Sequence, residues 1–214
     1  MKKGAYTLLI VALLIIATRC NNKDTDESKF KEEYESLNHE YLAIDISKDN
    51  NIKYSTVNEV VDILQNGTGI IYLGNPFDAM SRNVVPVLLE SASELGVEEI
   101  YYLNIKNEDS TDQMDSLTPS MEDYKILLDT LKDSLEHYKL EEDTMNPVNE
   151  DDNIVVIPTV IFAYEGEVVG IHTNSVKTHV DPNNLLTNDE KNELMDIYIN
   201  YIHKVLNDVC TEEC

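Results

Sequence analysis

Apolar positions between residues 56 and 105 change their spacing from segment to segment and predict four consecutive elements. A helix is expected after the capping-box pair Thr56 and Glu59, because the apolar residues that follow recur at helical spacing (Val57, Val60, Val61, Leu64). The apolar run 70–73 predicts a buried strand, an amphipathic helix is expected over 78–95, and a second strand over 99–105. Pro86 lies inside the second helix and should kink it. This strand–helix–strand order predicts a parallel pair joined by a right-handed crossover, as in α/β proteins.

The segment before residue 56 carries shorter patterns. Residues 28–37 predict a short helix that places Phe30, Tyr34 and Leu37 on one side. Residues 41–46 alternate Leu, Ile and Ile with other residue types and predict a strand. A turn is expected at 49–51.

Residues 106–153 interrupt the alternation of strands and helices and form a predicted acidic insertion. Its polar start predicts a loop, and apolar residues at helical spacing predict a helix over 120–138. Two acidic runs, 141–143 and 150–152, flank Asn146-Pro147. Calcium binding needs six to eight oxygen ligands, and the runs lack the glycine and the spacing of an EF-hand. We interpret them as a solvated loop and predict no metal site.

The last third of the chain predicts a strand, a hairpin and a helix. The apolar segment 152–162 is interrupted at Ile157-Pro158-Thr159, and Glu165-Gly166 marks the turn to a second strand. A capping box at Thr187 and Glu190 opens a final helix whose apolar face should cover the sheet (Leu194, Ile197, Tyr198, Tyr201, Ile202, Val205, Leu206).

Two separated motifs resemble the thioredoxin superfamily. In the first motif a strand leads into a turn at a helix start, over G-I-I-Y-L-G-N-P-F-D-A-M-S-R-N-V-V-P-V-L-L. In that family a proline commonly follows the second redox cysteine by five positions, and Pro86 follows Ser81 by five. Asp78 and Ser81 stand where the family has its Cys-x-x-Cys pair. The later Ile-Pro-Thr is similar to the family's cis-proline segment. A narrower similarity, to Gram-positive membrane-attached thioredoxin-like proteins, is carried by G-T-G-I-I-Y-L-G-N-P, S-R-N-V-V-P-V-L-L-E, I-Y-Y-L-N-I and the late P-T-V. Some of those proteins are described as bacteriocin transport accessory proteins.

The resemblance implies a thioredoxin-like α/β fold over residues 40–214, with a central mixed β-sheet, flanking helices and the 106–153 insertion ahead of the cis-proline strand. It also implies a peptide-docking groove beside Pro158, formed with Phe77, Ile157 and Thr159.

The substitutions at the two cysteine positions remove the redox chemistry. Thiol–disulfide exchange proceeds by thiolate attack through a mixed disulfide, which neither Asp78 nor Ser81 can form. Asp78 is expected to cap the helix N-terminus instead. A hydrolytic role would need a base beside Ser81, and none of the five histidines lies near Ser81 in sequence. We therefore predict no enzyme activity at this turn and no cofactor.

The first 19 residues have the layout of an export signal. Two lysines precede an apolar core of signal-peptide length, and Cys20 opens a polar linker with a short helix over 20–39. This layout is similar to a bacterial lipoprotein signal with Cys20 as the lipidated residue. Arg19 stands where that pattern has a small residue, so an uncleaved anchor and ordinary secretion stay open as alternatives. All three place the domain outside the cytoplasm, with the first two attaching it to the membrane.

The charge balance excludes one class of partner. The 214 residues carry 41 acidic and 16 basic side chains, a net charge of −25, whereas nucleic-acid binding needs clustered lysine and arginine. The acidity also disfavours anionic lipid surfaces, so membrane attachment should be hydrophobic or covalent. Of three cysteines, Cys210 and Cys214 are left as a candidate disulfide that an exported compartment permits.

Two functions follow as hypotheses. The first is a redox-inactive, exported binding protein that docks an exported peptide or surface protein beside Pro158. The second is a thiol–disulfide oxidoreductase that uses Cys210 and Cys214, although two neighbouring glutamates oppose the lowered thiol pKa that such activity needs. A structural or adhesion lipoprotein is a third interpretation.

Overall fold

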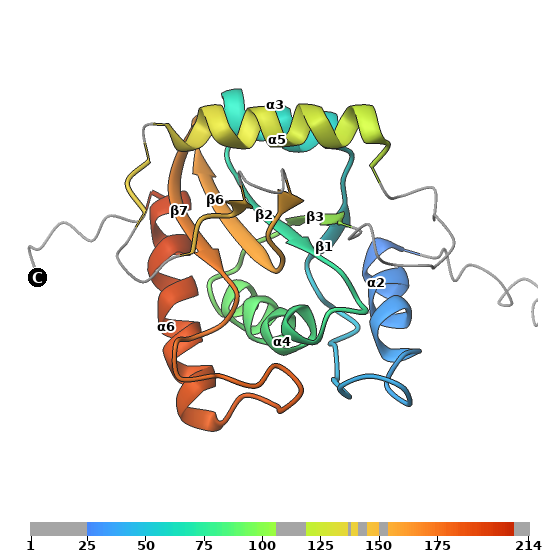
Figure 1. Cartoon of the computed structure of the whole chain (residues 1–214). Coiled ribbons are helices and arrows are strands. Elements are labelled where there is room, and N and C mark those ends of the chain that lie inside the picture. Colours follow the sequence, from blue (N-terminus) through green and yellow to red (C-terminus); the bar gives the residue numbers. More distant parts are fainter. Residues whose placement is uncertain (1–24, 106–118, 137, 141–144, 150–153, 208–214) are drawn as a thin grey trace, which may run out of the picture.

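A mixed five-stranded sheet forms the centre of the protein in the spatial order β1-β3-β2-β6-β7 (Figure 1). The computed structural model describes residues 25–105, 119–136, 138–140, 145–149 and 154–207. Three strands run parallel, β1 (Ile52–Tyr54), β3 (Ile100–Asn104) and β2 (Gly69–Gly74). Strand β6 (Thr159–Tyr164) runs antiparallel to β2 and forms a hairpin with β7 (Glu167–Thr173).

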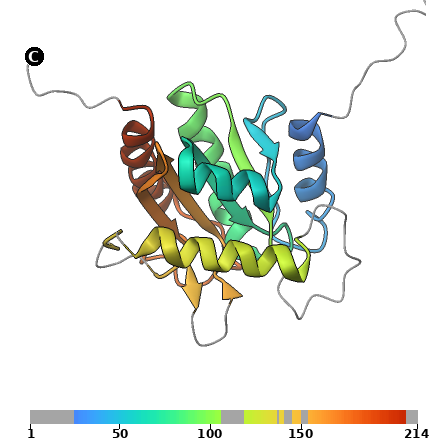
Figure 2. The same ribbon diagram turned by 90° about the horizontal axis from the view of Figure 1, so that it is seen from above.

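Helices cover both faces of this sheet. Helices α3 (Val57–Asn66) and α5 (Met121–Leu135) lie over one face, and α4 (Ala79–Glu94) and α6 (Asn188–Val205) lie over the other (Figures 1 and 2). Helix α2 (Asp26–Glu35) lies beside β1. The predicted α/β class, with a mixed sheet between helices, is confirmed.

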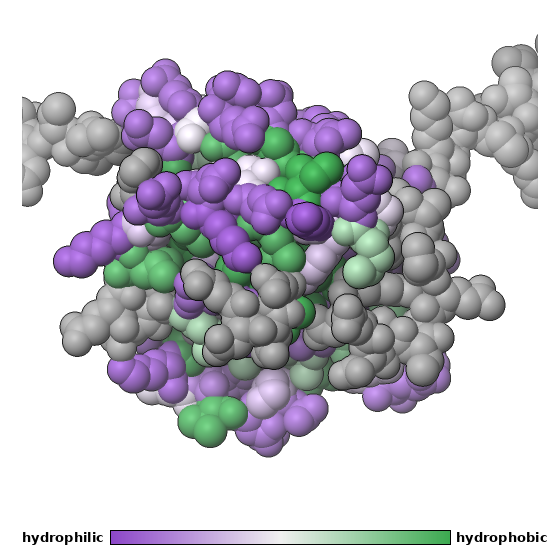
Figure 3. All heavy atoms as spheres, turned by 45° about the horizontal axis from the view of Figure 1, so that its top comes forward, coloured by the Kyte–Doolittle hydropathy of each residue, from purple (hydrophilic) through white to green (hydrophobic). Residues whose placement is uncertain are grey.

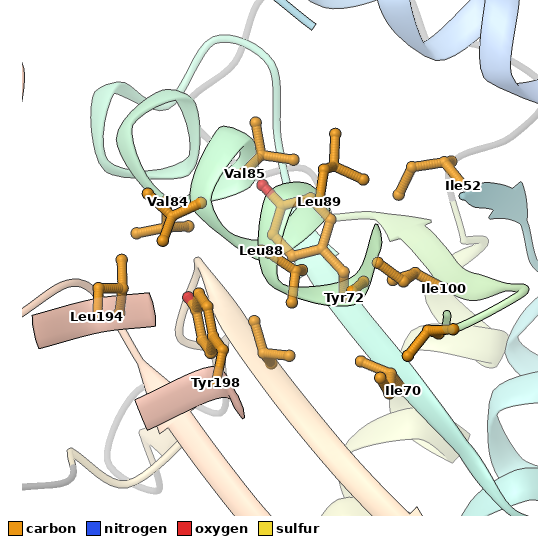
Figure 4. Close-up of a cluster of buried hydrophobic side chains, with 14 of the residues drawn as sticks. Ile52, Ile70, Tyr72, Val84, Val85, Leu88, Leu89, Ile100, Leu194 and Tyr198 are labelled. Carbon is orange, nitrogen blue, oxygen red and sulfur yellow. The ribbon is translucent and has the colours of Figure 1, made fainter. Parts of the chain in front are cut away.

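Strand β2 is buried on both faces and divides the core into two clusters. Ile70 and Tyr72 face α4 and α6, and Ile71 and Leu73 face α3 and α5, because successive strand residues point to opposite faces. Figure 4 shows side chains of α4 and α6 meeting Tyr72 and Ile70 over the first face. Phe30 and Tyr34 of α2 are completely buried in the same cluster, so the core includes residues before position 40.

Most predicted helix ends are confirmed by their caps. Thr56 and Thr187 each form a capping box, with Glu59 and Glu190 respectively. Asp78 caps α4, and Pro86 lies inside that helix. The hairpin turn is also confirmed, since Glu165 and Gly166 both adopt positive φ angles, of 50° and 81°.

The strand predicted over 41–46 is wrong. Ile44 and Ile46 are buried, but their N–H groups donate to side-chain oxygens of Asn38 (3.0 Å) and Glu35 (2.8 Å) instead of a neighbouring strand. The sheet edge is formed by β1, which the sequence pattern did not indicate. Leu206 is also wrong as a sheet-facing residue, because it lies at the end of α6 and is 39% exposed.

A two-stranded ladder lies at the end of the predicted insertion. Strand β4 (Val148–Asn149) pairs antiparallel with β5 (Ile154–Val155), directly ahead of Pro158. The 1–19 signal segment, Cys20, the acidic runs 141–143 and 150–152, Cys210 and Cys214 lie outside the described residues.

Candidate functional site

The turn between β2 and α4 is built on the side chain of Asn75, which is 5% exposed. Its amide nitrogen donates to the carbonyl of Ile105 at 2.9 Å, and its oxygen accepts the N–H of Phe77 at 2.8 Å. The turn is therefore fixed both to the end of β3 and to itself. Sequence reasoning missed this role, because Asn before proline indicates a turn without indicating which distant groups hold it.

Asp78 begins α4, as predicted. Its carboxylate accepts the N–H of Ser81 at 2.6 Å, which satisfies one of the N–H groups left unpaired at a helix start. Burial raises the pKa of the Asp78 carboxyl, and hydrogen bonds from Ser81 and from the backbone of Met80 offset only part of that increase. Asp78 thus has a structural task in this helix.

Ser81 is completely buried and its polar atoms are engaged. Its Oγ accepts the N–H of Asn75 at 3.2 Å, and its carbonyl accepts the hydroxyl of Tyr72 at 3.4 Å. Among the described residues, no histidine hydrogen-bonds to Ser81, and the carboxylate beside it, that of Asp78, is engaged as the cap of α4.

Arg82, the next residue, is completely buried without a carboxylate partner in the described part of the chain. Its guanidinium donates to the carbonyls of Tyr34 (2.9 Å), Leu42 (2.6 Å) and Pro76 (2.9 Å), and to the side-chain oxygen of Asn38 (2.6 Å). Burial lowers the pKa of this guanidinium. Arg82 therefore joins the N-terminal segment to the turn, a role that the sequence pattern did not reveal.

Register places Pro158 at the same end of the sheet as this turn. Leu73 pairs with Thr159, so the next position along β2, Gly74, lies beside Pro158. The Ile157–Pro158 peptide bond is cis, as the resemblance implied. The structure thus brings the two separated motifs together at the ends of adjacent strands.

The four predicted groove residues differ in accessibility. Phe77 and Ile157 are half-buried, whereas Pro158 is buried and Thr159 is completely buried. The hydroxyl of Thr159 donates to the carbonyl of Val156 at 2.7 Å and also lies 3.2 Å from the hydroxyl of Thr173. Thr159 therefore holds the loop in place, and its side chain is not available to a partner.

The backbone of Ile157 is unpaired within the described residues. The carbonyl of Pro158 accepts the N–H of Asn174 at 2.8 Å, and the N–H of Val156 donates to the carbonyl of Pro147 at 2.8 Å. No hydrogen bond from described residues reaches the N–H or the carbonyl of Ile157 between them. Ile157 is half-buried, so a residue at the sheet end beside Pro158 has a backbone donor and acceptor without partners among the described residues.

An aromatic pair lies on the turn side of the site. The rings of Tyr41 and Phe77 meet edge to face, with centroids 5.6 Å apart. Tyr41 is 38% exposed, so the pair offers apolar surface to solvent. Met145 is 54% exposed, and its sulfur lies 3.5 Å from the side-chain amide nitrogen of Asn174, whose backbone N–H donates to the carbonyl of Pro158.

Two hollows lie elsewhere on the protein. One, of about 400 Å³, lies between α4 and the segment 45–51 and is lined in part by Pro86. The other, of about 390 Å³, lies beside β1. Neither is lined by Asp78, Ser81 or the residues around Pro158. The described residues contain no cluster of three or more histidine, cysteine or acidic side chains fit for a metal ion. On the α3–α5 side, hydrophilic side chains surround smaller hydrophobic patches (Figure 3).

Comparisons with known proteins add no assignment. No protein-family model matches the chain, and no curated protein matches it. Within the described residues, none of the helices has the length and apolar character needed to cross a membrane.

The raised pKa of Asp78 predicts a pH-dependent difference between this protein and its Asp78→Asn variant. The pKa of the Asp78 carboxyl is higher in the folded state than in the unfolded state, so the folded state binds its proton more tightly. As the pH rises from the unfolded-state pKa to the folded-state pKa, the contribution of Asp78 to stability therefore falls. Asparagine also caps helices but does not titrate. Urea unfolding from pH 3 to pH 8 should show the variant gaining stability relative to the parent across that window and a constant difference above it. A difference independent of pH would contradict the assignment.

Proposed function

We propose that this protein is a redox-inactive, thioredoxin-like binding protein that docks an extended segment of a partner along the backbone of Ile157, beside Pro158. The observation that carries the proposal is the N–H and carbonyl of Ile157, which have no hydrogen-bond partner among the described residues and lie at the sheet end that also holds the Asp78–Ser81 turn. An extended peptide offers the complementary acceptor and donor in the geometry of a strand pair. The apolar surface of Phe77 and Tyr41 lies where a partner side chain would pack.

The thioredoxin-like assignment is supported by topology. Parallel β1, β3 and β2 adjoin antiparallel β6 and β7, a cis-proline precedes β6, and the β2–α4 turn lies at the same sheet end. That combination agrees with the fold implied by the sequence motifs.

Loss of redox activity is supported by the contacts of the two substituted positions. Asp78 is a helix cap, and Ser81 is buried with its hydroxyl engaged. A hydroxyl cannot form the mixed disulfide that exchange requires. The alternative oxidoreductase depends on Cys210 and Cys214, which lie outside the described residues.

The binding claim can be tested by site-specific photocrosslinking in cells. A benzophenone amino acid in place of Phe77 should form adducts that survive reducing agent, because the partner would pack beside this ring. The same replacement at Tyr164 is a matched control, since that partly exposed aromatic residue ends β6 at the opposite end of the strand. Equal adducts at both positions, or none at residue 77, would contradict docking beside Pro158.

Export with lipid attachment at Cys20 is proposed from the signal-like sequence alone. Mass spectrometry of the membrane-extracted protein should find a diacylated Cys20 as the first residue, and a Cys20→Ser variant should lose that species. An intact Met1 on the extracted protein would favour the uncleaved anchor, and an unlipidated mature chain in the medium would favour secretion.

A further inference from the structure

The backbone before Pro158 has two edges, and the protein's own groups occupy them differently. The N–H of Val156 donates to the carbonyl of Pro147, which extends the β4–β5 ladder by one hydrogen bond. The N–H of Val155 donates instead to the hydroxyl of Tyr124 at 2.8 Å. Successive N–H groups of an extended chain point to opposite edges, so Tyr124 lies on the edge away from β4.

Ile157 is the next residue whose backbone faces the Tyr124 edge. Pairing along one edge of a strand advances two residues at a time, about 7 Å. A partner strand that paired with Ile157 would therefore reach Val155 next. That N–H is already bound to the hydroxyl of Tyr124, so the pairing has no further donor there.

The position of Tyr124 is set by its helix. It lies in the first turn of α5, where Ser120 caps the helix by accepting the N–H of Asp123 at 3.2 Å. Its ring is half-buried and packs against the cluster between α3, α5 and the sheet. The hydroxyl is thus held against Val155 by a helix that belongs to the core.

We propose that Tyr124 is a specificity-determining residue that ends the docking edge at Ile157, so that a partner pairs its backbone with this chain at one residue only. This inference rests on the proposed function and specifies the kind of segment that fits. Selection among partners would then come from side chains that reach Phe77 and Tyr41, and long strand addition would be excluded.

The occupant that fits is an extended segment of a different protein. An N–H and a carbonyl on one residue match a peptide backbone. A second copy of this chain is disfavoured because each copy carries a net charge of −25 and like charges repel.

A tethered peptide provides a defined probe. The full chain would carry Asp78→Cys with Cys20, Cys210 and Cys214 replaced by serine. The probe is a nine-residue threonine–valine peptide whose central cysteine carries thionitrobenzoate as a mixed disulfide. The thiolate of residue 78 would attack the peptide sulfur and release thionitrobenzoate, forming a protein–peptide disulfide. The tether gives the peptide a millimolar effective concentration at the site. A matched peptide with N-methylated backbone cannot donate to the Ile157 carbonyl, and its methyl groups prevent the close strand approach through which a peptide carbonyl would accept the Ile157 N–H. A second tether through Phe77→Cys keeps the Asp78 cap intact.

Amide hydrogen exchange of the conjugates gives the readout. The unmethylated peptide should slow exchange at Ile157 at least tenfold, and the methylated peptide should not. Exchange at Val155 should be slow throughout, because Tyr124 already binds its N–H. In a Tyr124→Phe background, Val155 should exchange at least tenfold faster before conjugation and should be slowed again by the unmethylated peptide. Tyr164→Phe controls for loss of a tyrosine hydroxyl elsewhere.

The failures of the two claims are distinguishable. If neither peptide affects Ile157 with either tether, the docking edge itself is wrong, and the proposed function falls with it. A second pattern would refute only the role of Tyr124. In it, the peptide slows amide exchange at Ile157, but Tyr124→Phe does not speed exchange at Val155 before conjugation, or exchange at Val155 stays fast after conjugation. The peptide would then bind at Ile157 as proposed, but Tyr124 would not limit the pairing to that residue.

Discussion

The buried guanidinium of Arg82 is the constraint on which the candidate site depends. A buried cation is costly unless its donors are satisfied, and Arg82 meets this need with three backbone carbonyls and the side chain of Asn38. Those acceptors come from α2, from the segment after it and from the β2–α4 turn. The arginine can remain buried only while these three parts stay together.

The arrangement of the site follows from that constraint. Because Arg82 holds the carbonyls of Leu42 and Pro76, Tyr41 and Phe77 are brought next to each other. Asn75 fixes the same turn to the end of β3. The turn therefore keeps its shape through hydrogen bonds that need no sulfur, and Asp78 strengthens it as the cap of α4. The geometry beside Pro158 is therefore maintained without a disulfide at this turn.

Local signals in the sequence predicted most of the fold. The caps at Thr56, Asp78 and Thr187 and the turn at Gly166 are decided by neighbouring residues, so sequence spacing was sufficient. The errors arose where distant side chains replace backbone pairing. Residues 41–46 alternate like a strand, but their N–H groups bind Asn38 and Glu35, a choice that periodicity cannot show.

The candidate site was predictable only in outline. The motifs indicated Asp78, Ser81 and Pro158, but not that Thr159 is inaccessible or that Arg82 ties the site together. Both facts depend on long-range contacts, namely Thr173 for Thr159 and Tyr34 and Leu42 for Arg82. Tyr124 was expected only as part of a helix face, and its hydrogen bond to Val155 depends on how α5 lies over the ladder.

The most direct test of the central claim is insulin reduction with dithiothreitol by the natural chain and by an Asp78→Cys/Ser81→Cys variant. The natural chain should match both the uncatalysed rate and its Cys210→Ser/Cys214→Ser variant. The double-cysteine variant should exceed each single-cysteine variant at least tenfold, because the turn and Pro158 would again surround a dithiol. A natural chain that reduces insulin, or a folded double-cysteine variant that stays at background, would contradict the proposal of a thioredoxin-type site that lacks only the two sulfur atoms.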